Sequence, residues 1–366
     1  MCLGICSRPV GREPVNVADY EALAAERLEP AVLGYFAGGA GDERTLRRNL
    51  EAFEDWELMP RVLVDVTEVD TTIELFGSRL SMPLVVAPFA FQRLVHPDGE
   101  EALARAVGRA GTAMCLSTLA TSTPARVAAA APETTRWFQL YSFKDKAVTE
   151  ALLAEAVENG FEAVALTVDA PYVGRRERDL RTGFQVDRTV PAIEAALGAD
   201  RALTVTELFS LVDPSLDWDS LAALVESCEV PVLLKGVLSP QDAELAVEAG
   251  AAGIVVSNHG GRQLDGVPAT IDALPDVAEA VAGRIKLLVD GGFRRGIDVL
   301  TALALGADAV QVGRPALWGL AVNGEEGALH VLELLREEIK LGLALLGCRT
   351  PADVTRAHVR HRLRPR

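Results

Sequence analysis

The sequence is poor in the residues that build disulfide frameworks and metal centres. Its 366 residues include only five histidines, and no pair of them has the HExxH spacing, so no metal site is expected. The cysteines are odd in number, scattered and partly inside apolar runs, which disfavours disulfides or a four-cysteine zinc site and is typical of a reducing cytosol. These cysteines are Cys2, Cys6, Cys115, Cys228 and Cys348.

Basic residues and long hydrophobic runs are also scarce. The chain has 36 basic against 52 acidic side chains and a net charge of -16, so it lacks the basic face that a nucleic-acid partner requires. No uncharged run approaches the roughly 20 residues of a membrane span, and the first residues hold no apolar stretch of signal-peptide length. We therefore expect a soluble cytoplasmic protein without a nucleic-acid or membrane partner.

What the sequence does contain is eight short runs rich in Val, Leu and Ile, separated by segments with alanine and leucine at helical spacing. Eight near-continuously apolar strands alternating with helices indicate a parallel sheet buried on both faces, and eight is the number that closes a (β/α)8 TIM barrel. A doubly wound sheet is the alternative. The predicted strands are 82–90, 112–119, 137–143, 163–169, 230–237, 253–259, 285–291 and 309–314, with helices at 99–110, 146–159, 239–248 and 296–305.

The whole chain is interpreted as one α/β domain. Residues 1–80 are expected to form an N-terminal helical cap, the first 60 of them preceding any strand, residues 81–320 the barrel, and residues 321–366 a C-terminal helix and tail. This last helix is predicted at Glu326–Leu346 and is closed by Gly347.

One connection departs from this regular spacing. Residues 171–229, between the fourth and fifth strands, include a polar, proline-containing stretch that is much longer than an ordinary loop. Such a stretch is usually an active-site lid or a disordered excursion, and a lid loop is predicted at about 174–217.

The strongest chemical signal is the apolar run from Ile254 that ends in His259, two glycines and Arg262. A base, a tight turn and a fixed cation at the end of a buried strand have the parts needed to take a proton from an anionic substrate. In a (β/α)8 barrel the site is built at the C-terminal ends of the strands, so the polar residues there are the candidates. Each alone has another explanation, because a strand-end Asp or Ser often caps a helix and a lone His is often structural.

A phosphate site is predicted after the last two strands. Glycines in Asp290–Gly296 and Gly313–Pro315 let backbone N–H groups approach an anion, while Arg294 and Arg314 supply charge. Two tight βα turns are the alternative. The chain has no GxGxxG in a βαβ setting and no GxxxxGK[ST], so the phosphate is expected to belong to a cofactor other than NAD or ATP.

Several motifs, spread from about Val17 to about Arg356, together resemble the FMN-dependent 2-hydroxy acid oxidases and dehydrogenases, a family that includes glycolate, lactate and mandelate oxidisers. The resemblance implies a (β/α)8 barrel, FMN as cofactor, an S-2-hydroxy acid as substrate and a homotetramer. The motifs are VVAPFAFQRLVHPDGE, QLYSFKD, LTVDAPYVGRRERD, VLLKGV, SNHGGRQLDGVPAT, LVDGGFRRGIDVLTALALGADAVQVGRP and LLGCRT.

The resemblance also implies roles. His259 would be the general base, oriented by Asp169, and Lys235 would stabilise negative charge on the flavin. The implied catalytic residues are His259, Asp169, Tyr141, Lys235 and Arg262. The implied substrate-binding residues are Tyr35, Tyr141, Arg176, His259, Arg262 and Leu119. The implied cofactor-binding residues are Ala87, Pro88, Ala90, Ser117, Gln139, Thr167, Lys235, Ser257, Asp290, Gly291, Arg294, Gly313 and Arg314.

Two departures from the glycolate-type pattern bear on the substrate. Leu119 stands where those members carry a tryptophan, which opens the pocket to mandelate-like or longer aliphatic acids, while Phe89 replaces a small polar residue. Phe89, Phe143 and Tyr172 are interpreted either as the lining of an aryl pocket or as core and lid residues.

The electron acceptor is not fixed by these residues. No cytochrome domain precedes the barrel, so O2, giving H2O2, is the expected acceptor. A dehydrogenase that uses a quinone or a protein acceptor is the alternative within enzymes. A flavin-binding barrel without turnover is a third reading, which the complete set of catalytic residues disfavours.

Overall fold

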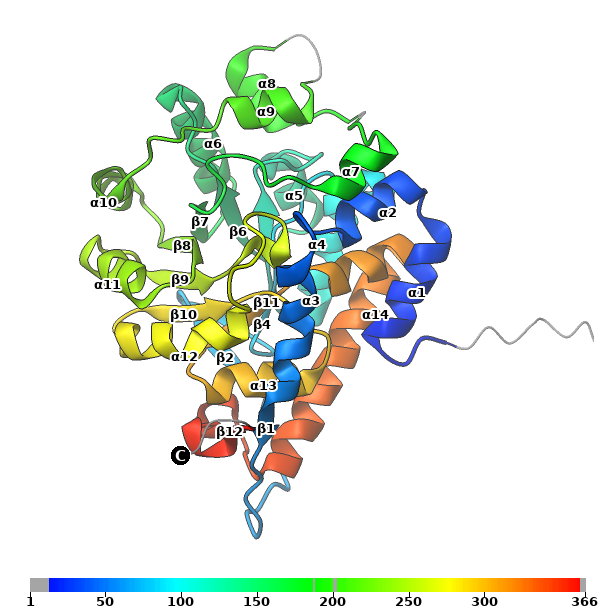
Figure 1. Cartoon of the computed structure of the whole chain (residues 1–366), viewed down its shortest axis with the longest axis vertical. Helices are drawn as coiled ribbons and strands as arrows, with labels where there is room; N and C mark the ends of the chain where they lie inside the picture. Colours follow the sequence, from blue (N-terminus) through cyan, green and yellow to red (C-terminus); the bar gives the residue numbers. More distant parts are fainter. Residues whose placement is uncertain (1–12, 187, 200–202, 363–366) are drawn as a thin grey trace, which may run out of the picture.

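The computed structural model describes residues 13–186, 188–199 and 203–362, so Cys2 and Cys6 lie outside the described part. Eight parallel strands close into a barrel in the order β10-β11-β4-β5-β6-β7-β8-β9 (Figure 1). Because the order closes on itself, the predicted (β/α)8 barrel is confirmed and the doubly wound sheet is wrong. The strands are β4 Leu84–Val86, β5 Ala113–Ser117, β6 Thr135–Leu140, β7 Ala163–Thr167, β8 Val232–Val237, β9 Gly253–Val256, β10 Lys286–Val289 and β11 Ala309–Val312.

All eight predicted strands are present, but most end two or more residues earlier than their apolar runs do. The run expected to end at His259 leaves the ladder after Val256, and the run expected to reach Asp169 leaves it after Thr167. The residues beyond the ladder turn into loops at one end of the barrel. The polar side chains at the predicted strand ends are therefore free to point into that end.

Helices surround the barrel and pack their apolar faces on its strands. Several begin at a side-chain cap; Thr123, Asp145, Asp217 and Ser239, for example, each accept a hydrogen bond from a backbone N–H of the first turn. These helices are α4 Gly99–Ala110, α5 Pro124–Ala130, α6 Lys146–Glu158, α10 Trp218–Ser227, α11 Pro240–Glu248, α12 Thr270–Val281, α13 Gly296–Ala304 and α14 Arg314–Leu346.

The last helix is longer than predicted. It ends at Leu346 with Gly347 in the left-handed region, as expected, but α14 begins at Arg314 rather than at Glu326. Non-helical backbone at Asn323 and Gly324 kinks it between the two parts. The predicted helix therefore covers only the part after the kink, because Asn323 and Gly324 interrupt the helical pattern.

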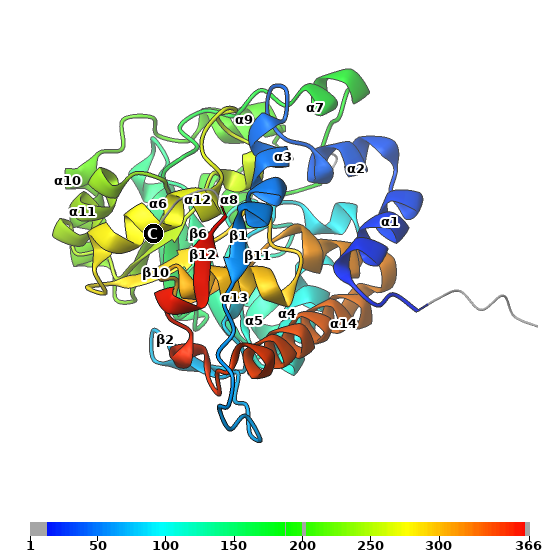
Figure 2. The same cartoon turned by 60° about the horizontal axis from the view of Figure 1, so that its bottom comes forward.

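The N-terminal cap is only partly helical. It holds α1 Val17–Arg27, α2 Pro30–Ala37 and α3 Arg44–Glu51, but β1 Trp56–Leu58 follows and pairs with β12 Val359–His361. Figure 2 shows these two short strands side by side. The expectation that no strand lies within the first 60 residues is therefore wrong. Three-residue strands are too short to show a period of two, and the partner of β1 lies about 300 residues away.

A second element of the predicted cap is the hairpin of β2 Ile73–Leu75 and β3 Ser78–Leu80. Its side chains pack against residues of all eight barrel strands, in a separate apolar cluster. The ring of Phe76 lies edge-on to that of Trp137, with centroids 5.4 Å apart. The hairpin therefore covers the N-terminal end of the barrel.

The long connection after β7 is not an open loop. It contains α7 Glu177–Thr182, α8 Pro191–Leu197 and α9 Val205–Ser210, which lie along the upper edge of Figure 1, where α7 packs beside α2 and α8 packs against α6. Its role as a lid stays a prediction. Within the described residues, no helix is both long enough and apolar enough to span a membrane.

Candidate active site

The C-terminal ends of the strands open into a pocket of about 980 Å³, its open mouth included. Every residue predicted to bind substrate or cofactor lines this pocket except Ser257, and every predicted catalytic residue does except Asp169. Ser257 and Asp169 lie behind the lining residues. Each forms a hydrogen bond with a residue that does line the pocket, Ser257 with Lys235 and Asp169 with His259. The sequence thus predicted a set that the fold brings together, although the set comes from the cap and from all eight barrel strands and the loops that follow them.

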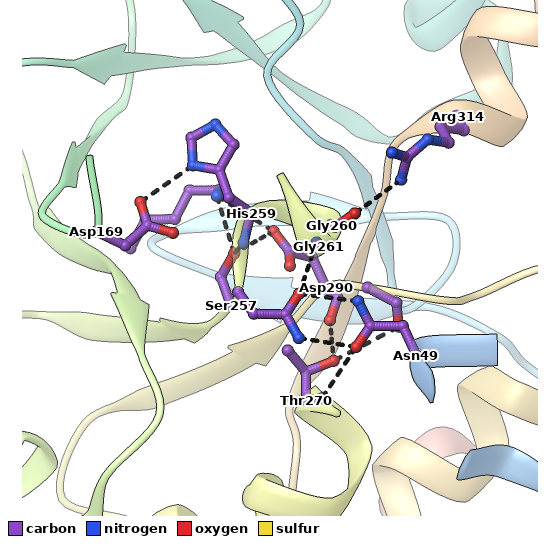
Figure 3. Close-up of polar contacts among 12 residues, drawn as sticks. Asn49, Asp169, Ser257, His259, Gly260, Gly261, Thr270, Asp290 and Arg314 are labelled. Carbon is purple, nitrogen blue, oxygen red and sulfur yellow. Dashed lines mark hydrogen bonds and ion pairs between the residues drawn. The ribbon is translucent and has the colours of Figure 1, made fainter. Parts of the chain in front are cut away.

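His259 and Asp169 form the central polar pair. His259 Nδ1 lies 3.0 Å from Asp169 Oδ1, as Figure 3 shows. A carboxylate only accepts hydrogen bonds, so Nδ1 carries the proton and Nε2 keeps its lone pair. Burial lowers the pKa of His259 in spite of the nearby carboxylate. Burial raises the pKa of Asp169, but the hydrogen bond from His259 and the positive charge of Lys235 act against burial, and that pKa is lowered overall. The pair therefore rests as neutral imidazole and ionised carboxylate.

Lys235 is held by a buried hydroxyl and a buried carboxylate. Its Nζ donates to Ser257 Oγ at 3.0 Å and lies 3.3 Å from Asp290 Oδ2, while Ser257 Oγ donates to the same Asp290 oxygen at 2.9 Å (Figure 3). Burial lowers the pKa of Lys235, but Asp290 and Asp169 together raise it more. The ammonium stays charged, which satisfies the requirement that a buried charge be paired.

Two arginines flank a buried tyrosine at the pocket mouth. The guanidinium carbons of Arg262 and Arg176 lie 4.7 and 5.7 Å from the centroid of the Tyr35 ring, and Phe184 stacks on that ring at 4.5 Å. Arg262 donates to the backbone carbonyls of Tyr35 and Gly38. Burial and the neighbouring Arg176 lower the pKa of Arg262 to about 10, so it is still a cation at neutral pH. Arg176 Nε is buried without a hydrogen-bond partner. A buried cation and a half-buried one with spare donors make a site for a small anion.

The sequence matches a known protein family over most of its length. Residues 24–361 match the family described as FMN-dependent dehydrogenase. The chain belongs to this family.

Relatives of the chain are similar over nearly their whole length. Glycolate oxidase 1 of Oryza sativa subsp. indica is 46% identical over 355 residues, which cover 95% of this chain and 96% of that protein. 2-Hydroxyacid oxidase 1 of Homo sapiens is 44% identical over 357 residues, covering 94% and 96%. Among solved structures, mandelate oxidase with (S)-4-hydroxymandelic acid has a TM-score of 0.89 and 41% identity, covering 95% of this chain and 98% of that one.

FMN, the cofactor of the family, fits the interior of the pocket. Buried polar atoms without a partner lie along its wall, and a bound flavin and ribityl chain would supply their missing hydrogen bonds. These atoms are Gln139 Nε2, Thr167 Oγ1, Asp290 Oδ1, and Nε2 and Oε1 of Gln311.

The part of the pocket that follows β10 and β11 also fits the phosphate of FMN. Gly291 and Gly292 have φ of +95° and +86°, a conformation that favours glycine, and helix α14 begins at the pocket wall. Arg314 is the first residue of this helix, and its guanidinium donates to the carbonyl oxygens of Phe36, Gly260 and Gly38. Arg294 pairs with Glu21 at 3.3 Å.

The three aromatics that the sequence left undecided fall into three places. Phe89 lines the pocket, Phe143 is 1% exposed in the core, and Tyr172 is 74% exposed at the surface. Phe209 of α9 does line the pocket and packs edge-on against Tyr141, with ring centroids 5.9 Å apart. Burial raises the pKa of Tyr141, so its hydroxyl stays a donor.

Six pocket residues were not predicted. For Gln311 the sequence carried a signal, because a polar side chain interrupts the apolar run of β11 and must find a partner inside the barrel. For the others it carried little, since aromatic residues and turn residues are common in cores and loops. The six are Phe36, Phe209, Gly260, Phe293, Gln311 and Pro315.

Proposed function

We propose that this chain oxidises an S-2-hydroxy acid to the 2-oxo acid. The observation that carries the proposal is a neutral, carboxylate-oriented histidine in an FMN-family pocket that also holds a buried arginine, Arg176, and a half-buried one, Arg262. Bound FMN would accept the two electrons and one of the two protons that leave the substrate. His259 Nε2 removes a proton from the substrate, and Asp169 stabilises the imidazolium that forms.

Substrate orientation follows from the charges at the mouth. Arg262 and Arg176 bind the carboxylate, with the hydroxyl of Tyr35 as a third donor. Tyr141, which stays protonated, donates a hydrogen bond to the substrate hydroxyl. Lys235 lies deeper in the pocket and favours negative charge on the flavin, an electrostatic effect that is strong in a buried site.

We further propose a side-chain pocket larger than glycolate needs. Leu119, Phe89 and Phe209 supply apolar lining, and Leu119 leaves the space that an indole would fill. Mandelate oxidase, a structural relative, has been solved with aryl acids. Turnover of S-mandelate and long-chain S-2-hydroxy acids should therefore exceed that of glycolate in kcat/KM.

The pocket size is tested by Leu119→Trp. This change should lower kcat/KM for S-mandelate by roughly 10–200-fold, because an added indole competes with the aryl group, and should affect glycolate far less. Leu216→Phe, at a position outside the pocket, is the matched control. If Leu119→Trp lowers kcat/KM equally for S-mandelate and for glycolate, the side chain of the substrate does not occupy this space.

Oxygen is the proposed acceptor, with H2O2 as product, and a quinone or protein acceptor is the alternative. Relatives named glycolate, L-lactate and 2-hydroxyacid oxidase favour oxygen. Stopped-flow mixing of the substrate-bleached enzyme with air-saturated buffer, and separately with a soluble quinone, distinguishes the two. Rapid return of the oxidised-flavin absorbance in air supports the oxidase; rapid return only with the quinone overturns it.

A cytoplasmic homotetramer is proposed for the assembled protein. Apolar side chains stand exposed on the segment before β2 and on α14, a surface that a second copy would cover. These are Val62, Leu63, Leu341 and Leu345, which are 81%, 103%, 61% and 70% exposed. Light scattering should give four chain masses, and Leu63→Asp should lower that number; a single chain mass for the unaltered protein contradicts the proposal.

A further inference from the structure

The turn that carries His259 has a backbone conformation that histidine rarely adopts. His259 has φ of +58°, and Gly260 and Gly261 follow at +63° and +76°. A non-glycine residue persists in this region only where its surroundings hold it. Here the conformation matters, because it directs the ring so that Nδ1 lies 3.0 Å from Asp169. The hydrogen bond from His259 N to Ser257 Oγ, at 3.1 Å, fixes only the start of the turn.

The neighbouring residue supplies a second restraint. Asn258 pairs with Asn49 of helix α3 through two reciprocal hydrogen bonds, each amide donating to the oxygen of the other at 2.8 Å (Figure 3). Both residues are buried, at 4% and 2% exposure. Each side chain must offer a donor and an acceptor at once, so a carboxylate at either position would bring two acceptors face to face.

The amide pair also ties down the loops on either side. Asn258 Oδ1 accepts from Gly261 N at 3.1 Å, which closes the turn around His259, and Asn258 Nδ2 donates to the carbonyl of Pro268 at 3.1 Å. Asn49 Oδ1 accepts from Thr270 N at 3.4 Å. Each oxygen of the pair therefore accepts two hydrogen bonds, and the pair reaches the start of helix α12.

Helix α3 packs directly on the backbone of the turn. A Cβ on Gly261 would lie 2.7 Å from both Leu46 N and Leu46 Cα, so this contact needs glycine. The N–H of Ala40 donates to the carbonyl of Gly261 at 2.8 Å. The same helix meets the loop after β10, because a Cβ on Gly292 would lie 1.9 Å from the carbonyl oxygen of Asn49. A single helix of the N-terminal segment thus contacts both loops.

We propose that Asn49 and Asn258 are positioning residues: their amide pair holds the His259 turn in its left-handed conformation, so that Asn49 of helix α3 supports the base through the turn. Neither residue lines the pocket, so each acts through the turn and not on the substrate. This inference rests on the proposed role of His259 as the base.

The test uses the FMN-loaded protein and follows anaerobic loss of flavin absorbance on mixing with S-mandelate. Asn258→Ala should lower the limiting rate by about 10²-fold, since a small misplacement of a catalytic group has an effect of this order, with little change in the half-saturating substrate concentration. Asn49→Ala should have a smaller effect, because Asn258 keeps its bonds to Gly261 and Pro268. The double variant should be no slower than Asn258→Ala, since both changes remove one interaction.

Two further variants separate positioning from general weakening. Arg48→Ala, on the same helix, removes ion pairs to Asp55 and Asp272 but leaves the amide pair intact, so its limiting rate should stay near that of the unaltered protein. Asn49→Asp keeps the size and both acceptor bonds but places a carboxylate oxygen against Asn258 Oδ1, where the donor was. It should resemble Asn49→Ala, and it serves as the test if an alanine variant does not fold.

A crystal structure of the Asn258→Ala protein gives a readout that does not depend on turnover. We expect His259 to leave positive φ and its Nδ1 to move out of reach of Asp169. An unchanged turn, or limiting rates for both asparagine variants equal to that of Arg48→Ala, would overturn the proposal. If no 2-hydroxy acid bleaches the unaltered protein, the proposed function fails, while the crystal structure still decides whether the amide pair positions the turn.

Discussion

The two ends of the same barrel differ sharply in chemistry. At the N-terminal end, the β2–β3 hairpin covers a cluster made of apolar side chains from all eight strands, with Leu75 and Leu80 each 1% exposed. At the C-terminal end, buried polar atoms of Gln139, Thr167 and Gln311 have no partner among the residues that the structure describes. The N-terminal end is a closed apolar cluster, whereas the polar atoms at the C-terminal end would gain hydrogen-bond partners from a bound ligand.

The change from apolar to polar side chains occurs between successive inward-facing residues of a single strand. On β6 the core residue Trp137 is followed two positions later by Gln139, and on β8 Leu233 is followed by Lys235. Alternate residues of a strand share a face, and two residues span about 6.6 Å. A residue that stabilises the fold and a residue that lines the pocket are therefore only two positions apart on each of these strands. Substitutions at the two ends should nevertheless have separable effects.

The largest effect is expected from His259→Gln at the C-terminal end. It removes the base but keeps a polar side chain of similar size, so flavin reduction by substrate should slow by about 10²–10⁴-fold. Anaerobic stopped-flow absorbance measures this rate. Normal reduction by the variant would mean that His259 is not the base.

Lys235→Met should have the next largest effect. Flavin reduction should fall by about 10²–10³-fold because the buried positive charge is lost. Asp290 would also be left without its cation, so the free energy of unfolding should drop by about 3–5 kcal/mol. Stopped flow and denaturant titration measure the two quantities. Lys235→Arg, which keeps the charge, is the control, and equal rates for both variants would show that charge is not what matters there.

Leu75→Ala tests the opposite end. Removing a side chain that is 1% exposed should lower the free energy of unfolding by about 2–5 kcal/mol, while kcat and KM at 25 °C stay within about twofold, since no residue of the pocket is touched. Thermal denaturation and steady-state kinetics check both parts. A large loss of kcat without loss of stability would break the division between the two ends.

The smallest effect is a shift in pH dependence. Burial lowers the pKa of His259, and only the neutral imidazole acts as a base. The value of kcat/KM should therefore rise with pH through a pKa below about 6.5 and stay flat across neutral pH. Asp169→Asn removes the carboxylate that raises this pKa, so the rise should move to still lower pH while the plateau falls. A rise centred well above 6.5 would contradict the assigned buried, neutral state.

The sequence predicted the barrel from local signals, and it predicted nearly all of the pocket from the polar residues at strand ends together with the resemblance to the family. Buried parallel strands are continuously apolar, and a polar residue such as Lys235 at the end of one of them is conspicuous. Short elements escaped detection: β1 and β12 have three residues each and pair across the whole chain. Contacts of this kind depend on tertiary structure and not on local pattern.

The same limit applies to the site. Phe209 could not be assigned from the sequence, because its place in the pocket depends on how the long connection after β7 folds into α9. Nor could the pairing of Asn49 with Asn258, whose residues are 209 positions apart. The sequence shows well which residues carry out the chemistry. It shows poorly which contacts hold those residues in position.

The most direct test of the account is anaerobic mixing of the FMN-loaded protein with S- and R-2-hydroxy acids from glycolate to mandelate, followed by admission of air. The account predicts rapid loss of oxidised-flavin absorbance with S-acids, fastest for those with larger side chains, and prompt return of colour in air. A protein that stays yellow with every acid would contradict it and would identify a flavin-binding barrel without this turnover.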